Sequence, residues 1–317
     1  MNIIIHRGTH QIGGSAIEIS TASTRIILDF GNELSLDEKY IPINLDIDGV
    51  TKGMPDCAGI VISHYHMDHL GQLTSALPEI PLYMGKLSKE VAMIATEHQD
   101  KDLYLRLLGA NTFRGGEAFT IGNIHIRPLV IDHSAVDSYM FVIEAEGKRV
   151  LYTGDFRMHG LRSHIVEKLV KTYIGEVDVL ITEGTLVSRG VNDGISEAAV
   201  LEDIYSYIQD GKYVFVICSS TNIDRIMGIW QNMPTDKVLI CDAYQKRILD
   251  TVINNVYYES SLYRRHDSPL VLDKGKYPKY YMDNGFVCLV RATENHISHI
   301  KEFPKDDVRI IYSMWTG

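Results

Sequence analysis

The stretch Ser63–His69 reads Ser-His-Tyr-His-Met-Asp-His and places three imidazoles and one carboxylate within six residues. It follows an apolar run, residues 58–62, that is typical of a buried strand. His64 and His66 are two positions apart, so at an extended strand end their side chains point the same way and can bind one ion. The spacing therefore predicts a metal site at the end of this strand.

The second half of the stretch offers ligands for another ion. Asp68 and His69 fall where we expect the chain to leave the strand for a helix starting near Gly71. Zinc is bound mainly by His, Cys and carboxylate groups, and a cluster without Cys leaves room for water among the ligands. A loop of four unrelated polar residues is the alternative, but the types and spacing favour a catalytic metal site.

Three more candidates stand at predicted strand ends. Asp29 closes the run 26–28, His133 follows the run 129–131, and Asp155 follows Gly154, whose missing side chain allows close approach to an ion. Each of them alone could be an ordinary turn residue. Together they complete a ligand set: His64, His66 and His133 for one ion, Asp68 and His69 for the other, and Asp155 bridging both.

Residues around this set have weaker claims. Glu183 follows the buried run 177–181 and is expected to orient a ligand or handle a proton, with an exposed turn carboxylate as the alternative. We assign Asp68 and Glu183 as the candidate catalytic side chains. His159 and His164 are candidate substrate contacts, and Asp132, beside His133, is a predicted turn former or partner of a ligand.

The composition limits the class of protein. The 317 residues are 45% hydrophobic and 23% charged, values ordinary for a globular protein. No apolar run is long enough to cross a membrane, and the first residues read as a strand rather than a signal peptide. The four scattered cysteines predict buried free thiols, and a cytoplasmic location follows by default.

The net charge of −10 argues against a protein that coats nucleic acid. It leaves open an enzyme that binds nucleic acid in one cleft, because two zinc ions add about four positive charges locally.

The organisation of the chain changes near Ser196. Before it, short strands surround one broken helix expected over 86–108. After it, strands and helices alternate, which predicts a second unit built on a mostly parallel sheet.

The ordered set of candidate ligands resembles the motif series of the metallo-β-lactamase fold. The resemblance covers about residues 2–185 and implies an αββα sandwich with two zinc ions at one edge, manganese being an alternative. It implies that Asp155 bridges the ions, that a hydroxide between them is the nucleophile, and that Asp29 supports the ligands without binding metal.

The run Ile181–Thr185 looks like the acidic motif after which the β-CASP nuclease branch inserts an α/β cap. The implied fold class is α/β, a metallo-β-lactamase fold with an inserted cap and with the C-terminal part of the fold missing. The expected domains are 1–185 (metallo-β-lactamase), 186–307 (β-CASP-like cap) and 308–317 (start of the return). The family supplies a last zinc-binding histidine after the cap, yet no histidine follows His299. We therefore expect either a chain that stops in mid-fold or a second zinc ion with incomplete ligands.

The resemblance implies a ribonuclease J-like phosphodiesterase that cleaves single-stranded RNA held between the two domains. A small-molecule hydrolase of thioesterase or lactonase type, a DNA nuclease and a non-catalytic scaffold are the alternatives. Exonuclease or endonuclease action stays open, and so does the oligomeric state, with a homodimer as one option.

Overall fold

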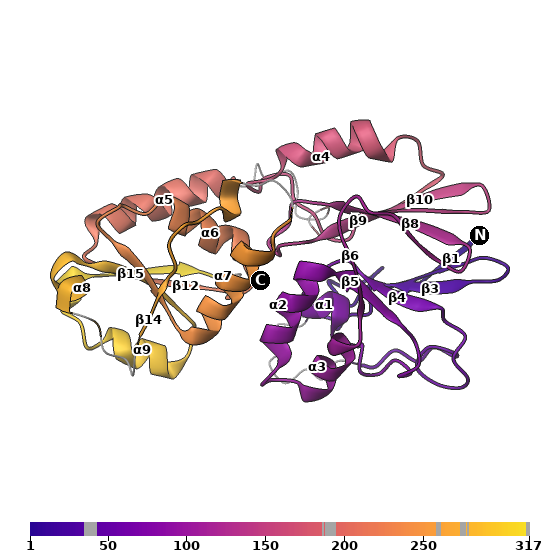
Figure 1. Ribbon diagram of the computed structural model, residues 1–317, viewed down its shortest axis with the longest axis horizontal. Helices are drawn as coiled ribbons and strands as arrows, with labels where there is room; N and C mark the ends of the chain where they lie inside the picture. The colour runs from indigo at the N-terminus through magenta and orange to yellow at the C-terminus, as the bar shows by residue number, and fades with distance from the viewer. Residues whose placement is uncertain are drawn as a thin grey trace. The chain divides into compact units, whose positions relative to one another are not determined.

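The computed structural model describes residues 1–34, 43–185, 187, 195–257, 261–272, 277 and 279–314. The chain divides into two compact units, Met1–Met158 with Arg162–Asp193 and His159–Leu161 with Gly194–Gly317. Both contain strands and helices, which confirms the mixed α/β class (Figure 1). Within the described ranges, every helix is too short or too polar to cross a membrane.

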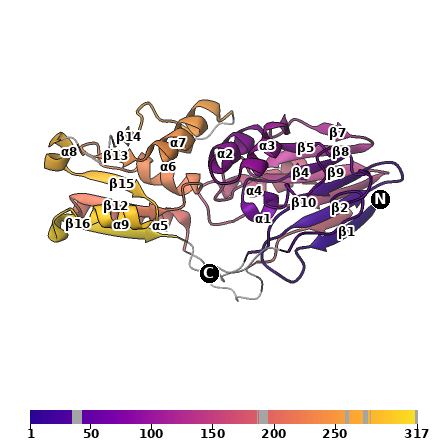
Figure 2. The same cartoon turned by 90° about the horizontal axis from the view of Figure 1, so that it is seen from below.

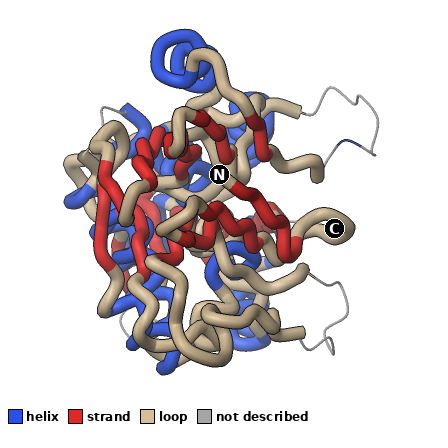
Figure 3. Tube along the Cα trace, turned by 90° about the vertical axis from the view of Figure 1, so that its right-hand side faces the viewer, coloured by secondary structure: helices blue, strands red, loops and turns tan. Residues whose placement is uncertain are grey.

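Two sheets form the centre of the first unit (strands red in Figure 3). In the described residues, the first sheet has the spatial order β1 (Asn2–Arg7), β2 (Ala16–Ser20), β3 (Arg25–Leu28), β4 (Gly59–Ile62), β5 (Leu82–Gly85) and β6 (Asn111–Phe113). The second has the order β11 (Val179–Ile181), β10 (Lys148–Tyr152), β9 (Tyr139–Ala145), β8 (Ile124–Val130) and β7 (Phe119–Ile121). The strands from β3 to β6 run parallel, so their carboxyl ends share one edge of the sheet.

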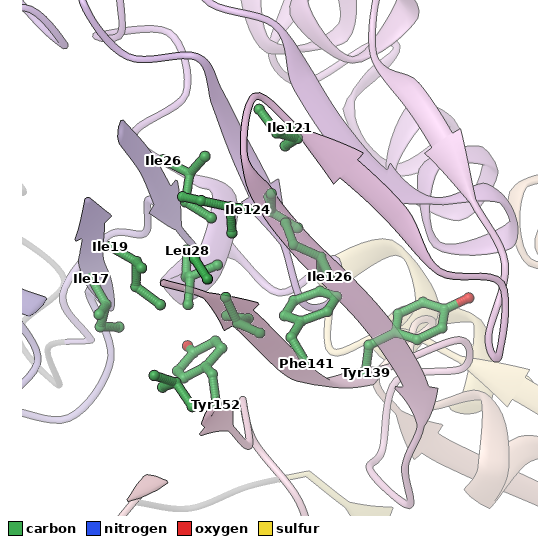
Figure 4. Close-up of a cluster of buried hydrophobic side chains, with 14 of the residues drawn as sticks. Ile17, Ile19, Ile26, Leu28, Ile121, Ile124, Ile126, Tyr139, Phe141 and Tyr152 are labelled. Carbon is green, nitrogen blue, oxygen red and sulfur yellow. The ribbon is translucent and has the colours of Figure 1, made fainter. Parts of the chain in front are cut away.

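A common core joins the inner faces of these two sheets (Figure 4). Alternate residues of β2 and β3, such as Ile19 and Leu28, face Ile126 and Phe141 of the second sheet. Leu28 and Phe141 are fully buried. This packing places the strand ends of the second sheet against those of the first.

Helices cover the outer faces of both sheets, which gives the αββα layering (Figure 1). The outer helices of the first sheet are α1 (Met67–Leu70), α2 (Lys86–Thr96) and α3 (Lys101–Leu108), and α4 (His164–Leu169) with the π-helix Val170–Ile174 covers the second. The expected broken helix over 86–108 is confirmed as α2 and α3. After the interruption, α3 begins directly after Asp100, whose side chain accepts a hydrogen bond from Leu103 N and caps the helix.

The second unit is built on a parallel sheet (Figure 2), as the alternation of strands and helices predicts. Its described strands have the spatial order β14 (Leu270–Val271), β13 (Val238–Cys241), β15 (Phe286–Val290), β12 (Tyr213–Cys218) and β16 (Val308–Ser313). The connecting helices are α5 (Glu197–Asp210), α6 (Ile223–Gln231), α7 (Ala243–Asn255), α8 (Lys279–Asn284) and α9 (Glu294–Ile300), with 3-10 turns at Ser261–Tyr263 and Lys305–Asp307. Residues of α9 and the turn after it, among them Ile300 and Phe303, pack on Phe215 and Phe286 of the sheet.

One expected domain assignment differs from the structure. Residues 308–317 were expected to begin a return to the first domain, but Val308–Ser313 is β16 of the parallel sheet. It pairs with β12 from Tyr213–Val308 to Cys218–Ser313, and these backbone hydrogen bonds assign it to the second unit. Residues 315–317 lie outside the described residues. The division into metallo-β-lactamase and β-CASP-like domains stays a prediction.

The cysteines are buried free thiols, as expected. Burial raises the pKa of Cys57 and Cys218 to about 11 and the pKa of Cys241 and Cys288 to about 12. We predict that none reacts appreciably with iodoacetamide at pH 8 in the folded protein, since the reactive thiolate is about 0.1% or less of each thiol. Mass spectrometry should find all four alkylated in denaturant. Alkylation of one thiol at its unfolded-state rate in the native protein would contradict this.

Candidate metal centre

The Ser63–His69 stretch starts where β4 ends, at the carboxyl edge of the first sheet. The helix that follows it begins at Met67, inside the motif, and not near Gly71 as expected. The reason is that His66 O accepts hydrogen bonds from the backbone N–H groups of His69 and Leu70, at 2.9 and 3.1 Å, which closes a helical turn at once. Residues 71–75 are hydrogen-bonded turns.

Two glycine-containing loops fix the backbone of α1. Asp68 O accepts hydrogen bonds from Gly14 N and Ser15 N, at 3.1 and 3.2 Å, and His69 O accepts one from Phe30 N at 2.7 Å. A Cβ atom on Gly31 would lie 1.6 Å from Asp68 O, so only glycine permits this approach. The position of Asp68 and His69 therefore depends on loops from elsewhere in the chain.

His64, His66 and His133 lie together, as expected. His66 Nδ1 is 3.1 Å from His64 Nε2 and 3.1 Å from His133 Nε2. One donor atom from each residue falls within 4.8 Å of the other two, so one ion fits among them.

A second group brings together His64, His69 and Asp155, also with donor atoms within 4.8 Å. His69 Nε2 is 3.2 Å from Asp155 Oδ1 and 3.6 Å from Asp68 Oδ2. His64 belongs to both groups, a sharing that its sequence position does not indicate. All six candidate ligands thus lie in one cluster, and their assignment to individual ions stays a prediction.

Asp29 lies beneath the cluster and is fully buried. It accepts hydrogen bonds from Ser63 N and Ser63 Oγ, each at 2.7 Å, and from Tyr152 Oη at 2.5 Å. It also lies 2.7 Å from His69 Nδ1, which leaves Nε2 of that ring directed at Asp155. Asp29 thus bonds the side of the His69 ring opposite to Asp155, and its role as support for a metal ligand stays a prediction.

The imidazoles are held in two different protonation states. Burial, and then the positive charge of neighbouring imidazoles, keeps the pKa of His64 and His133 well below the ordinary value. Burial would also lower the pKa of His69, but Asp155 and Asp29 outweigh it and raise that pKa well above the ordinary value. The His69 charge in turn outweighs burial and lowers the pKa of Asp155. Without metal, a charged His69–Asp155 pair therefore stands beside neutral imidazoles.

His133 is held by an ionic network that its own sequence surroundings only partly indicate. Asp132 is fully buried and accepts hydrogen bonds from Arg157 Nε at 3.1 Å and Arg162 N at 3.2 Å. Arg162 Nη2 donates to His133 O at 3.1 Å. Asp132 thus acts as a partner of a ligand, one of its two expected roles, whereas the contributions of Arg157 and Arg162 were not predicted.

Glu183 lies close to Asp155. It accepts a hydrogen bond from the backbone N–H of Phe156 at 2.9 Å, and its pKa is raised mainly by burial. The histidines His159 and His164 are exposed and belong to neither ligand group.

Sequence reasoning missed Ser63 and Tyr152 as partners of Asp29. Ser63 stands directly before the first ligand, and Tyr152 stands three residues before Asp155. Their position as polar neighbours of candidate ligands was the signal in the sequence that could have identified them.

The cluster fits divalent metal: its donor set is imidazole and carboxylate, most of the imidazoles are neutral, and His69 is oriented by a carboxylate.

The fold and this cluster define a metallo-β-lactamase-type domain with a His/Asp centre at a sheet edge. A family model described as "Beta-lactamase superfamily domain" matches residues 40–200. The chain belongs to the β-lactamase superfamily.

Its relatives carry ribonuclease names. The chain is 26% identical to Endoribonuclease YSH1 of Gibberella zeae over 81% of this chain and 32% of that protein. It is 26% identical to the RNase J-like protein of Methanocaldococcus jannaschii over 67% of this chain and 49% of the relative. RNase aCSPSF2 of Saccharolobus solfataricus is 29% identical over 56% of this chain and 37% of its own length. The resemblance to the ribonuclease J-like branch is confirmed, and the chain spans about a third of YSH1.

A solved structure extends the likeness of fold to the whole chain. A protein of unknown function from Enterococcus faecalis V583 superposes with a TM-score of 0.74 at 16% sequence identity, over 99% of this chain and 88% of that one.

Replacing Asp29 by Asn should loosen His69. We expect metal affinity to fall by roughly 10–100-fold because the ligand loses its orienting carboxylate, and stability to fall by about 2–3 kcal/mol because a charged acceptor is lost. Competition with a chromophoric chelator and urea unfolding measure the two. Glu18→Gln is the matched control, since Glu18 is also buried in the first sheet but pairs with Arg25 outside the cluster. Parent-like affinity in Asp29→Asn would refute the role.

If these histidines alone are considered, the free energy of unfolding of the metal-free protein should be greatest near about pH 6.5. The lowered pKa of His64 and His133 makes the unfolded chain bind more protons below about 6.5, so stability falls as pH falls. The raised pKa of His69 has the opposite sign: its contribution is complete below about 6.5 and is lost as pH rises. Thermal unfolding in the presence of a chelator measures how stability falls below this pH (the acid limb) and above it (the alkaline limb). His69→Gln should flatten the alkaline limb, and an unchanged alkaline limb would contradict the assignment.

Proposed function

We propose that this chain carries the dinuclear zinc centre of a phosphodiesterase that cleaves single-stranded RNA. The observation that carries the proposal is the convergence of His64, His66, His133, His69 and Asp155 into two overlapping groups of donor atoms. The ribonuclease names of the relatives support RNA as the substrate class. Manganese has similar ligand preferences and is the alternative metal.

A bound pair of divalent ions supplies Lewis acidity for a phosphodiester and makes water nucleophilic near neutral pH. The protein supplies geometry and charge. Asp29 holds His69 in the orientation that presents Nε2, and Asp132 with its arginines holds His133. Arg157 is paired with the buried carboxylate of Asp132, and this ion pair lies beside His133.

Glu183 is proposed to handle a proton. Burial raises its pKa, so this carboxyl is protonated at a higher pH than an exposed glutamate and lies beside the Asp155 loop. The hydrogen bond from Phe156 N gives it a positioning role as well.

Replacing His66 by Ala should remove a ligand and abolish cleavage. With 5′-labelled single-stranded RNA and zinc-loaded protein, we expect roughly a 10³-fold or larger loss in kcat, because several kcal/mol of charge stabilisation disappear. Bound zinc, counted by mass spectrometry, should fall below the parent's two. His98→Ala is the control, because His98 is 86% exposed in its side chain and outside the cluster.

The outcomes separate the functions. Cleavage by the parent and not by His66→Ala supports a metal-dependent ribonuclease, and product lengths distinguish exonuclease from endonuclease action. A parent that binds two zinc ions and cleaves DNA or a small ester but not RNA would overturn the RNA assignment.

Glu183→Gln separates proton handling from positioning. Glutamine keeps an oxygen that accepts from Phe156 N but cannot exchange a proton, so we expect kcat to fall about 10²-fold or more while zinc content stays unchanged. Full activity of Glu183→Gln would show that Glu183 only positions the loop. Glu183→Ala measures both roles together.

A further inference from the structure

We propose that Arg7 is a positioning residue that sets the Asp68–His69 half of the metal centre. The inference rests on the proposed function in so far as that half binds an ion. Arg7 is the last residue of β1 and is 8% exposed, and its charged group lies among backbone carbonyls with Glu33 Oε1 3.5 Å from Nη1. Nothing in its sequence position marks it as part of a metal site.

The strand itself directs Arg7 inward. The pairing of β1 with β2 shifts register between Ile5 and Arg7, a bulge of the kind that re-aims a side chain. Arg7 Nε then donates to Gly14 O at 3.2 Å and Nη2 donates to Gly31 O at 2.9 Å. Nη1 donates to Ile43 O at 2.7 Å. One guanidinium therefore ties together three loop segments that are far apart in sequence.

Two of those segments contact the backbone of α1, which carries the candidate ligands Asp68 and His69. Gly14 N donates to Asp68 O, and Gly31 lies so close to the same carbonyl that it has no room for a Cβ atom. The neighbours of Gly31 continue the contact, because Phe30 N donates to His69 O and Asn32 N donates to Met67 O.

The loop that contains Gly13 and Gly14 is closely packed on both sides. Gly13 and Gly14 have φ values of +74° and +72°, and a Cβ on Gly13 would lie 2.7 Å from Asp68 Cβ. A Cβ on Gly14 would lie 3.1 Å from Arg7 Nε. This loop is thus packed between the guanidinium on one side and Asp68 on the other.

Arg7 with its carbonyl partners Gly14 and Gly31, here called the clamp, acts on one half of the centre. His133 is held instead by the network of Asp132 and Arg162, whereas the hydrogen bonds of Arg7 go to the loops around Asp68 and His69. Loss of Arg7 would leave the carbonyls of Gly14 and Gly31 without this donor and free the loops that locate Asp68 and His69. Because a metal ligand must be held closely to its productive geometry, the ion bound by His69 should be affected first.

The test is a zinc titration of chelator-treated parent and Arg7→Met, in competition with a chromophoric chelator. We expect one binding step of Arg7→Met to weaken by roughly 10–100-fold, the cost typical of losing an outer partner of a metal ligand, and the other to stay unchanged. Arg25→Met is the matched control, because Arg25 is a partly buried, ion-paired arginine of the same sheet. It should leave both steps unchanged.

A metal-independent readout accompanies the titration. In imidazole ¹⁵N–¹H spectra of the metal-free protein, Arg7→Met should shift the His69 signals and leave those of His133 in place. Unchanged His69 signals with two parent-like binding steps would overturn the proposal, and so would equal weakening of both steps.

The design separates the two hypotheses. If the parent binds fewer than two zinc ions, the dinuclear function fails, while the His69 spectra still decide the role of Arg7. If Arg7→Met does not fold, Arg7→Lys decides, since lysine keeps the charge but cannot reach three carbonyls in the planar arrangement of a guanidinium. An intermediate loss at one step supports the clamp, and parent-like behaviour in titration and spectra refutes it.

Discussion

The metal centre depends on one buried carboxylate. Asp29 directly follows β3 in a left-handed conformation, with φ +55°, and its two oxygens accept hydrogen bonds from Ser63 and Tyr152. Those partners follow β4 of the first sheet and end β10 of the second. A negative charge placed in a low-dielectric core is costly unless it is fully hydrogen-bonded, so Asp29 joins the sheets at the point where His69 is oriented.

The electrostatics of the cluster follow from the same arrangement. Two carboxylates, Asp29 and Asp155, flank His69 and favour its charged form, whereas His64 and His133 have mostly imidazoles as neighbours and stay neutral. Neutral imidazoles are the form that binds metal. An ion held by His69 would have to displace a proton, whereas an ion held by His64 and His133 would not, so the two halves of the proposed centre would respond differently to acidity.

Positioning of the ligands is shared among buried ionic groups. The Asp132 network reaches His133 through a backbone carbonyl, and Arg7 reaches Asp68 through two glycine loops. The Arg7 guanidinium donates to three carbonyls at once, which its planar set of donors allows, whereas the Arg162 guanidinium donates to His133 O. The centre is therefore held by the backbone around it as much as by contacts to the ligand side chains.

The sequence by itself determined the donor types, their positions at strand ends and the alternation that predicts a parallel second sheet. These features are local: the spacing of His64 and His66 and the runs before His133 and Asp155 report on neighbouring residues alone. Tertiary structure decided that His64 joins both ligand groups, that Tyr152 reaches Asp29 across 123 residues, and that β16 completes the sheet of the second unit. Those outcomes depend on how the sheets pair and face one another, and such long-range hydrogen bonds leave no periodic trace in a single sequence.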